Sequence, residues 1–498
     1  MKQRIIIIGG GITGCAIART LSRYQDLDIH LMEKEPDVGW GATKANTGIL
    51  HPGHEDDPQR FPLRAKLCVQ GNSLWKTWSK DLDIPTTWPG ELMIAKNDHE
   101  KDRLKTYVAI GRRNGVEGLK IIEGKDIFTI EPNCTPDVIA ALWAPTAGLI
   151  EPWEATIGLI ENAVENNVKI HLNTSVSDII VKNGQIAGLE TSQGFYPADI
   201  VINAAGLFAD TISKMAGIDE GPIRPRKGQY YLFDDDATPK VQKIIHQVPT
   251  ATTKGVYAVT TVEGNLMVGP TAEDLNMDEK DERSTDQIGL DYVWDHAAQL
   301  VKELPERKGI CKMFTGLRPE PPEGRYIITS YDDPWGFINV LGIRSPGLTA
   351  APAISEHVAK DILNERLGVS LVEKNDWNPH RKKIVRFSKL SLIEQEEYIK
   401  KDRRYGNIIC MCKEVTEAEI AHAIDRIQYL GGKVTLDAVK FRTLAMFGFC
   451  QGSFCRSKIA SIIADHLHIP LHTVIQNLPN TEYAIGDIKI LQRKGGQV

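Results

Sequence analysis

Four cysteines near the C-terminal end of the chain stand in two close pairs, Cys410 with Cys412 and Cys450 with Cys455. In a globular chain, cysteines grouped in this way favour a bound metal over disulfides. Both pairs fall on loops beside predicted helices, so the four thiolates can converge on one centre. Zinc also accepts four thiolates, but its paired ligands are usually separated by roughly two to four residues. The single-residue gap of the first pair therefore favours an iron–sulfur cluster, with zinc or two disulfides as alternatives.

The segments around these cysteines are predicted to be mainly helical. Thr416 and Glu419 form a capping box that opens a helix. Helix N-termini and nearby cations would offset part of the negative charge of a thiolate centre. The predicted helices span 417–427, 436–446 and 456–467, and the cations are Lys440, Arg442 and Arg456.

A second chemical motif, Gly-x-Gly-x-x-Gly, stands at the opposite end of the chain. The β-branched run 4–8 predicts a strand that is buried on both faces, and it leads directly into Gly9, Gly11 and Gly14. Gly9 permits a tight turn, Gly11 lets the backbone approach a pyrophosphate, and Gly14 lets the following helix, 15–21, pack on the strand. The helix N-terminus offers N–H groups and a positive dipole end to the phosphates.

The segment after this motif completes a dinucleotide site. A second apolar strand, 28–32, ends at Glu33, whose carboxylate can accept hydrogen bonds from both ribose hydroxyls of an adenine dinucleotide. A loop rich in glycine and hydroxyl groups follows, and it can lie along a pyrophosphate and reach an isoalloxazine ring. Its candidate ligands are Thr43, Asn46 and Thr47. Far downstream, a buried strand in 200–210 turns at the small residues Ala205 and Gly206.

With these segments in place, residues 1 to about 365 resemble the D-amino-acid-oxidase-like superfamily of FAD oxidoreductases. A further signature is the glycine turn 342–349, which leads into a predicted helix, 350–363, and resembles the segment that closes over the pyrimidine side of the flavin. The resemblance implies bound FAD and adds four candidate FAD-binding residues to those above. They are Gly342, Gly347, Leu348 and Thr349.

The resemblance also implies the domain organisation and an α/β fold class. A Rossmann-like FAD-binding domain would be interleaved with an antiparallel-sheet substrate domain, and a small, mainly helical [2Fe–2S] domain would follow. FAD segments are expected at about 1–85, 145–220 and 325–370, and substrate segments at about 86–144 and 221–324. A linker at 371–405 would then lead to the cluster domain and tail at 406–498. The basic run 381–386 is interpreted as part of a solvated linker, with contact to a membrane or a partner as the alternative.

Within that superfamily the chain is most similar to FAD-dependent glycerol-3-phosphate dehydrogenases and oxidases, with L-2-hydroxyglutarate dehydrogenases as near relatives. The similarity lies in the segments 44–53, 227–231, 254–257, 268–272 and 315–319. It implies oxidation of an alcohol, with hydride leaving a secondary carbon for the flavin. For glycerol 3-phosphate the product would be dihydroxyacetone phosphate, and an L-2-hydroxy acid is the alternative substrate.

Several residues are candidates for this chemistry. His51 matches a histidine proposed as the base in the family, and an imidazole titrates in the range that suits proton abstraction; His54 is its rival. The guanidinium of Arg318 is shaped to hold a phosphate or carboxylate. Lys254 and Ser345 are further candidates for binding the substrate. Arg344 departs from the pattern of the relatives, which usually carry an acidic residue there, and this leaves the substrate open.

The C-terminal segment resembles the bacterioferritin-associated-ferredoxin-like [2Fe–2S] domain, including its Cys-x-Cys and Cys-Gln-Gly-x-x-Cys forms. Flavin accepts two electrons as a hydride, whereas such a cluster carries one at a time. We therefore expect the cluster to pass electrons to a partner, either another flavoprotein or a quinone-linked subunit. The alternative is that the cluster domain regulates assembly and carries no turnover electrons.

Composition limits the partners and the compartment. The 498 residues carry a net charge of −6, which gives no reason to expect nucleic acid as a partner. No apolar run is long enough to span a bilayer, and the apolar start is interpreted as a strand, not as a signal peptide. We expect a cytoplasmic protein, free or peripheral to the membrane. The remaining cysteines, interpreted as small core residues, are Cys15, Cys68, Cys134 and Cys311.

Overall fold

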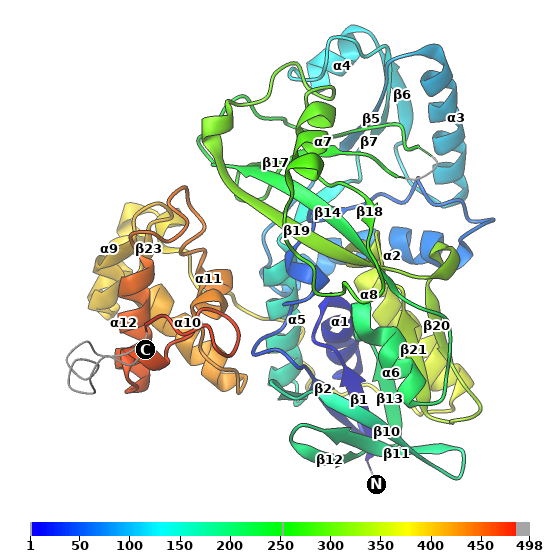
Figure 1. Cartoon of the computed structure of the whole chain (residues 1–498), viewed down its shortest axis with the longest axis vertical. Coiled ribbons are helices and arrows are strands. Elements are labelled where there is room, and N and C mark those ends of the chain that lie inside the picture. Colours follow the sequence, from blue (N-terminus) through cyan, green and yellow to red (C-terminus); the bar gives the residue numbers. More distant parts are fainter. Residues whose placement is uncertain (1, 251–252, 485–498) are drawn as a thin grey trace. The chain divides into compact units, whose positions relative to one another are not determined.

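The computed structural model describes residues 2–250 and 253–484. The chain divides into two compact units, which are described separately (Figure 1). The first comprises residues 1–33 and 38–381, and the second comprises 34–37 and 382–498. Among the described helices, none combines the length and the apolar character needed to cross a membrane.

The nucleotide half of the first unit is a six-stranded sheet. Its central strand, β1 (Gln3–Ile8), lies parallel between β2 (Leu27–Met32) and β13 (Ile200–Asn203), and its isoleucines are fully or almost fully buried. This burial on both faces explains why β1 reads as a continuous apolar run. The sheet order is β20-β21-β13-β1-β2-β9, with β9 (Lys169–His171), β21 (Phe337–Leu341) and β20 (Ile327–Ser330) completing it.

Helices pack around this sheet and lead into the site. α1 (Ile12–Leu21) packs against α5 (Pro152–Glu165) and α8 (Gly347–His357), and α8 also packs against α2 (Pro62–Asp81). The predicted helix 350–363 corresponds to α8 and the π-type helix that continues it, Val358–Arg366. Smaller elements complete this half: the 3-10 helix η1 (Ala42–Lys44), β3 (Ile49–Leu50), β4 (Thr86–Thr87), β8 (Gly148–Ile150), β10 (Val176–Lys182), β11 (Gln185–Thr191), β12 (Gly194–Pro197) and α6 (Ala209–Met215).

The other half of the first unit is a large, mainly antiparallel sheet in the order β18-β14-β17-β16-β15-β5-β7-β6, with β19 also paired to β14 (Figure 1). Only β15 and β5 pair in parallel among its described strands. The strands are β5 (Glu91–Ala95), β6 (Lys120–Glu123), β7 (Ala140–Ala144), β14 (Arg224–Phe233), β15 (Ile244–Gln247), β16 (Tyr257–Thr260), β17 (Leu266–Gly269), β18 (Glu273–Asp274) and β19 (Ile310–Glu320).

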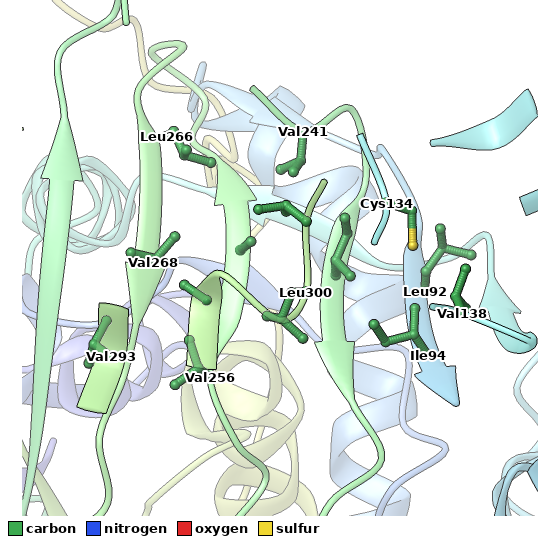
Figure 2. Close-up of a cluster of buried hydrophobic side chains, with 14 of the residues drawn as sticks. Leu92, Ile94, Cys134, Val138, Val241, Val256, Leu266, Val268, Val293 and Leu300 are labelled. Carbon is green, nitrogen blue, oxygen red and sulfur yellow. The ribbon is translucent and has the colours of Figure 1, made fainter. Parts of the chain in front are cut away.

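This second sheet has its own apolar core. Leu92, Val268 and Leu300 belong to one buried cluster on its face (Figure 2). Val293 of α7 (Gln287–Ala297) packs into the same cluster, and α3 (Asp98–Arg113) and α4 (Lys125–Ile130) cover strands at the β5–β6 end. The mixed α/β architecture of a Rossmann-like sheet with an antiparallel-sheet partner confirms the predicted fold class.

The second unit is mainly helical, as predicted. It contains α9 (Leu392–Lys401), α10 (Glu417–Tyr429), α11 (Leu436–Thr443), α12 (Arg456–Leu467) and a short hairpin of β22 (Ile408–Cys410) and β23 (Val415–Thr416). The capping box of Thr416 and Glu419 opens α10. The prediction that the next helix runs to residue 446 was wrong, because Leu444 adopts a left-handed φ of +62° that ends α11 three residues earlier.

The segment predicted as a solvated linker is more structured than its composition suggested. Arg381 is buried, and its guanidinium donates to Glu154 and Glu161 of α5, each at 2.7 Å. The interpretation of this part of the basic run as solvated was therefore wrong. Further along, α9 opens with a capping box, and Phe387 and Tyr405 are buried. Short hydrophilic segments that carry isolated aromatic residues can fold onto a core, and hydropathy alone does not reveal this.

Candidate active site and cysteine centre

The glycine motif forms a close-packed cradle at the start of α1. A Cβ on Gly14 would lie 2.0 Å from the carbonyl oxygen of Gly9, so the helix can approach the strand only without one. Gly9 has a φ of +106°, and its own Cβ would lie 2.5 Å from the carbonyl oxygen of Ala204. Gly11 is the N-cap of α1 and has no side chain of its own to cap the helix. The helix N-terminus is thus arranged as a pyrophosphate site requires.

The other predicted nucleotide residues lie around this cradle. Glu33 accepts a hydrogen bond from the Gly10 N–H at 2.6 Å, and Thr43 accepts from the Ile12 N–H at 3.1 Å. Asn46 accepts from the Gly48 N–H at 2.8 Å, which shapes the loop next to Thr47. The N–H of Ala205 donates to the side chain of Asn203 at the end of β13, and Gly206 follows with a φ of +60°.

The glycine turn before α8 lies beside the segment that carries His51. Gly342 has a φ of +68°, Gly347 begins α8, and the carbonyl of Leu348 accepts from the Trp75 indole at 3.0 Å. The hydroxyl of Thr349 accepts from the His51 N–H at 2.9 Å and donates to the carbonyl of Ile49 at 3.2 Å. This turn thereby fixes the backbone of the candidate base.

The side chain of His51 lies between a hydroxyl and a carboxylate. Its Nε2 is 3.4 Å from the Ser345 hydroxyl, and its Nδ1 is 3.7 Å from Oε2 of Glu55. The same Glu55 oxygen lies 2.5 Å from Nζ of Lys254, and the Tyr257 hydroxyl donates to the other oxygen at 3.3 Å. The structure thus brings together three residues proposed from sequence, His51, Lys254 and Ser345, and adds Glu55 as the group that connects two of them.

The charges in this cluster are set by burial and by the ion pair. Burial, and then the Lys254 ammonium, lower the pKa of His51 to about 4. Burial acts to raise the pKa of Glu55, but Lys254 and the neighbouring histidines outweigh it, so the pKa is lowered. Burial likewise acts against the Lys254 charge, yet Glu55 raises the pKa of this lysine. At neutral pH the arrangement therefore holds a neutral imidazole beside a partly buried ion pair.

The rival histidine, His54, has different neighbours. It is fully buried, and its Nε2 lies 3.4 Å from Oε1 of Glu91. His246 contacts the same oxygen at 3.2 Å. The contacts of His54 are therefore directed away from Ser345 and Glu55, which favours His51 as the candidate base.

The two arginines of interest lie in one cluster with Glu320. Arg318, on β19, is mostly buried and donates to the backbone carbonyls of Thr271 and Lys227, while its Nε has no hydrogen-bond partner among the described residues. Arg344 forms an ion pair with Glu320, so its charge is balanced locally. Gly316, also on β19, approaches the loop of η1 so closely that a Cβ would lie 1.9 Å from the Ala45 carbonyl oxygen. β19 therefore extends from the substrate sheet to the nucleotide loop.

The four C-terminal cysteines converge as two pairs. Sγ of Cys412 lies 3.6 Å from Sγ of Cys450, and the Cys455 thiol donates to Cys410. That hydrogen bond, with help from backbone N–H groups and against the effect of burial, lowers the pKa of Cys410 to about 6. A Cβ on Gly448 would lie 2.3 Å from Cβ of Cys412, so only glycine allows this approach.

The spacing of the sulfurs bears on the choice of metal. Tetrahedral zinc, with bonds of about 2.3 Å, needs all four sulfurs within roughly 4 Å of one another. Among the described residues, no three cysteine sulfurs all lie within 4.8 Å of one another. Two separate sulfur pairs match a [2Fe–2S] cluster, in which each iron takes two cysteines, better than they match a single zinc ion. Of the predicted cations, Arg442 instead pairs with Asp37, while Arg456 donates to the Gln451 carbonyl beside the cysteines.

Sequence reasoning missed the residues that connect these clusters. Glu55, Glu91, His246 and Tyr257 come from separate elements, and only the fold brings them together. One signal was present, since Glu55 follows His51 by four positions within a polar stretch. The strand residues Glu91, His246 and Tyr257 carried no comparable signal, because each lies in a short strand without a second ionisable residue.

This nucleotide-binding sheet, with its substrate sheet and cysteine module, defines a flavoprotein oxidoreductase with an iron–sulfur domain. Residues 4–360 match the FAD dependent oxidoreductase family, and residues 408–465 match the BFD-like [2Fe-2S] binding domain. The chain belongs to the FAD dependent oxidoreductase family. This confirms the superfamily resemblance and both predicted cofactors, FAD and a [2Fe–2S] cluster.

Individual relatives share much of the chain. It is 41% identical, over 94% of its length and 95% of the relative, to a glycerol 3-phosphate dehydrogenase of Caloramator mitchellensis. It is 31% identical to a glycerol 3-phosphate oxidase of Mycoplasma genitalium, over 76% of this chain and 97% of the relative. The FAD-bound structure of the L-alpha-glycerophosphate oxidase from Mycoplasma pneumoniae superposes with a TM-score of 0.70 at 28% identity, covering 76% of this chain and 98% of that one.

Proposed function

We propose that this enzyme oxidises sn-glycerol 3-phosphate to dihydroxyacetone phosphate and passes the electrons through its [2Fe–2S] cluster to a protein or quinone-linked acceptor. The observation that carries the proposal is the meeting of His51 and Lys254 at the carboxylate of Glu55. A neutral base and a partly buried cation are held side by side, as oxidation of a phosphorylated alcohol requires. The 41% identity to a glycerol 3-phosphate dehydrogenase supports this choice of substrate.

His51 is proposed to take the proton of the substrate hydroxyl. Its lowered pKa keeps it unprotonated at neutral pH, so it can act as a base. With Nδ1 protonated and directed to Glu55, Nε2 can accept the proton on the side where Ser345 lies. Glu55 would then stabilise the imidazolium that forms. When bound, FAD supplies the acceptor for the hydride that leaves the carbon carrying this hydroxyl.

Arg318 and Lys254 are proposed to hold the phosphate. Lys254 already forms an ion pair with Glu55, and Arg344 forms an ion pair with Glu320. Arg318 has no carboxylate within salt-bridge distance among the described residues, and backbone carbonyls hold its guanidinium in place. We therefore assign to Arg318 the larger share of phosphate binding, because a fixed guanidinium binds phosphate oxygens in a defined geometry.

The electron route is proposed from the domain composition. The Mycoplasma genitalium oxidase aligns over 76% of this chain and nearly all of its own length, so about a quarter of this chain has no counterpart there. The dehydrogenase relative aligns over 94%. A one-electron cluster fused to a two-electron flavin gives electrons an exit other than oxygen, which is what a dehydrogenase needs.

An anaerobic half-reaction on the purified enzyme tests the substrate. Flavin bleaching would be recorded after mixing with glycerol 3-phosphate and, separately, with L-2-hydroxyglutarate, since Arg318 could also hold a carboxylate. We expect fast bleaching by the phosphate and slow or no bleaching by the hydroxy acid. Bleaching by the hydroxy acid alone would transfer the activity to that substrate class. Failure of both would refute the substrate proposal.

A further inference from the structure

A second cluster of ionisable side chains lies next to the site, outside the proposed mechanism. It consists of His54 in the loop after β3, Glu91 at the start of β5 and His246 on β15. All three are fully buried. One ligand atom from each lies within 4.8 Å of the others, and Oε1 of Glu91 is 3.4 Å from Nε2 of His54 and 3.2 Å from Nε2 of His246.

The polar atoms of this cluster are poorly satisfied by the protein. No hydrogen bond of regular geometry reaches either ring nitrogen of His54, either oxygen of Glu91 or Nε2 of His246. Buried polar groups are nearly always hydrogen-bonded, and leaving a buried carboxylate unpaired is costly. A positive charge between these three fully buried side chains would therefore stabilise them, because it would interact with the carboxylate and with the lone pairs of the ring nitrogens.

The other ring nitrogen of His246, Nδ1, shows which nitrogen of this histidine is free to bind a metal. Its Nδ1 lies 3.0 Å from the carbonyl oxygen of Gln247, so Nδ1 carries the proton and donates it there. In the neutral ring, Nε2 then presents a lone pair to the carboxylate of Glu91. Metal-bound histidines commonly show this pattern, with one nitrogen donating to a carbonyl and the other on the metal.

We propose that His54, Glu91 and His246 bind a divalent transition-metal ion, such as zinc, at a site separate from the cysteine centre. Two imidazoles and one carboxylate form a known zinc ligand set, with bonds of about 2.0–2.2 Å. In a tetrahedral site such bonds place neighbouring ligand atoms roughly 3.3–3.5 Å apart, close to the distances from Oε1. Three protein ligands leave the fourth position for water or another small ligand.

Such an ion would connect the loop of the candidate base to the substrate sheet. β5 and β15 are adjacent parallel strands that pair Glu91 with Ile244, whereas His54 is only three residues beyond His51. Tyr257 joins the two clusters, because its ring stacks on His246 and its hydroxyl donates to Glu55. A metal here would hold His51 and Glu55 in position without contacting the substrate.

The competing arrangement is a protonated His246 paired with Glu91, beside a neutral His54. It needs no metal, but it leaves both ring nitrogens of His54 without a hydrogen bond. A metal provides a partner for one nitrogen of each histidine and for the carboxylate. The two arrangements differ in metal content and in electron density at one point, so both can be measured without reference to activity.

The test uses the intact holoenzyme. After dialysis against zinc and then against metal-free buffer, zinc and iron would be measured per FAD by mass spectrometry. Crystals would be recorded on both sides of the zinc absorption edge. We expect about one zinc per FAD and an anomalous peak between the three side chains. In Glu91→Gln and His246→Gln, zinc affinity should fall at least about tenfold, because these changes remove ligands and not merely their supporting contacts.

Two controls separate this site from other zinc binding. The exposed histidine variant His99→Gln should keep its zinc. A Cys410→Ser, Cys455→Ser double variant should also keep it, which excludes zinc held by the cysteines. Absence of an anomalous peak at the three residues in the wild-type holoenzyme would overturn the proposal, as would full zinc retention in both ligand variants. The anomalous map of the wild-type holoenzyme tests the proposal even if a ligand variant fails to fold.

Discussion

Oε2 of Glu55 lies 3.7 Å from Nδ1 of His51 and 2.5 Å from Nζ of Lys254, so one carboxylate contacts both the candidate base and a candidate phosphate ligand. Its pKa is lowered despite burial, so it stays charged at neutral pH. The charge of Glu55 therefore influences both the basicity of His51 and the position of Lys254.

The rate of flavin reduction by substrate should stay constant from neutral pH down to about 5 and fall as the pH approaches 4. Burial and Lys254 lower the pKa of His51 to about 4, so the base is protonated only there. The lowered pKa of His51 also affects stability. In the unfolded chain this histidine takes up a proton below a pH of about 6.5, whereas the folded chain resists protonation, so the folded state loses stability as the pH falls below about 6.5. Anaerobic stopped-flow measurements at several pH values check this. An acidic limb near 6.5 would contradict the assignment of His51.

Glu55→Gln should slow flavin reduction by about 10–100-fold, as loss of an orienting partner usually does. Because Glu55 raises the pKa of His51, the variant should also move the acidic limb to lower pH. FAD content per chain and the melting temperature would be measured in parallel. A variant that loses FAD or stability but keeps its pH profile would indicate a purely structural role. Partial recovery in Glu55→Asp would support positioning.

Arg318→Met should lower kcat/KM for the phosphate substrate by at least about 100-fold, since a charge-assisted contact made by a mostly buried guanidinium is lost. Arg318→Lys should recover only part of this, because a lysine cannot reproduce the fork that backbone carbonyls hold in place. Lys308→Met, a change at an exposed lysine in the turn before β19, serves as control. Equal losses in Arg318→Met and the control would argue against phosphate binding by Arg318.

Cys412→Ser should leave flavin reduction by substrate unchanged and abolish electron transfer to the physiological protein acceptor. Of the four cysteines proposed as cluster ligands, Cys410 and Cys455 are buried, Cys450 is half-buried and Cys412 is exposed, so the change at Cys412 should disturb the fold least. In the wild type, electron paramagnetic resonance should show a cluster reduced by substrate. A cluster that stays oxidised while the flavin is reduced would instead favour a regulatory role. Cys311→Ser, in the substrate sheet, is the matched control.

Gly14→Ala should yield a chain with little or no FAD, because the added Cβ would lie 2.0 Å from the Gly9 carbonyl oxygen and force α1 away from β1. Gly158→Ala, in the middle of α5, meets its nearest neighbour at an ordinary 3.5 Å and should retain FAD. The ratio of flavin to protein absorbance checks both. Normal FAD content in Gly14→Ala would contradict the role given to this cradle.

Arg381→Ala should destabilise the first unit by about 3–5 kcal/mol, because it leaves the buried carboxylates of Glu154 and Glu161 without their cation. The temperature at which flavin fluorescence rises would report this loss. The exposed neighbour Lys382→Ala should change the stability by no more than about 0.5 kcal/mol. Similar melting temperatures for the two variants would show that the buried ion pairs contribute little.

The parts of the fold and site that could be predicted from sequence are those whose chemistry is local. The glycines act through their spacing over a single turn and helix start, Glu33 follows at the end of the next strand, and the cysteines fall in two close pairs, so each pattern is visible in a short segment. Arg381 could not be predicted, because its partners on α5 are more than 200 positions away in sequence. The ion pair of Glu55 with Lys254 could not be predicted either, because an acidic residue in a polar stretch is normally expected to be solvated.

The two largest sheets of the first unit are built from strands that alternate along the chain, with β1 and β2 before β5, β13 before β14, and β20 and β21 after β19. No single cut in the chain therefore separates one of these sheets from the other. The match to the [2Fe-2S] domain, in contrast, occupies the one uninterrupted stretch 408–465. An ancestor could therefore acquire or discard this iron–sulfur domain in one genetic event without interrupting either of the two large sheets.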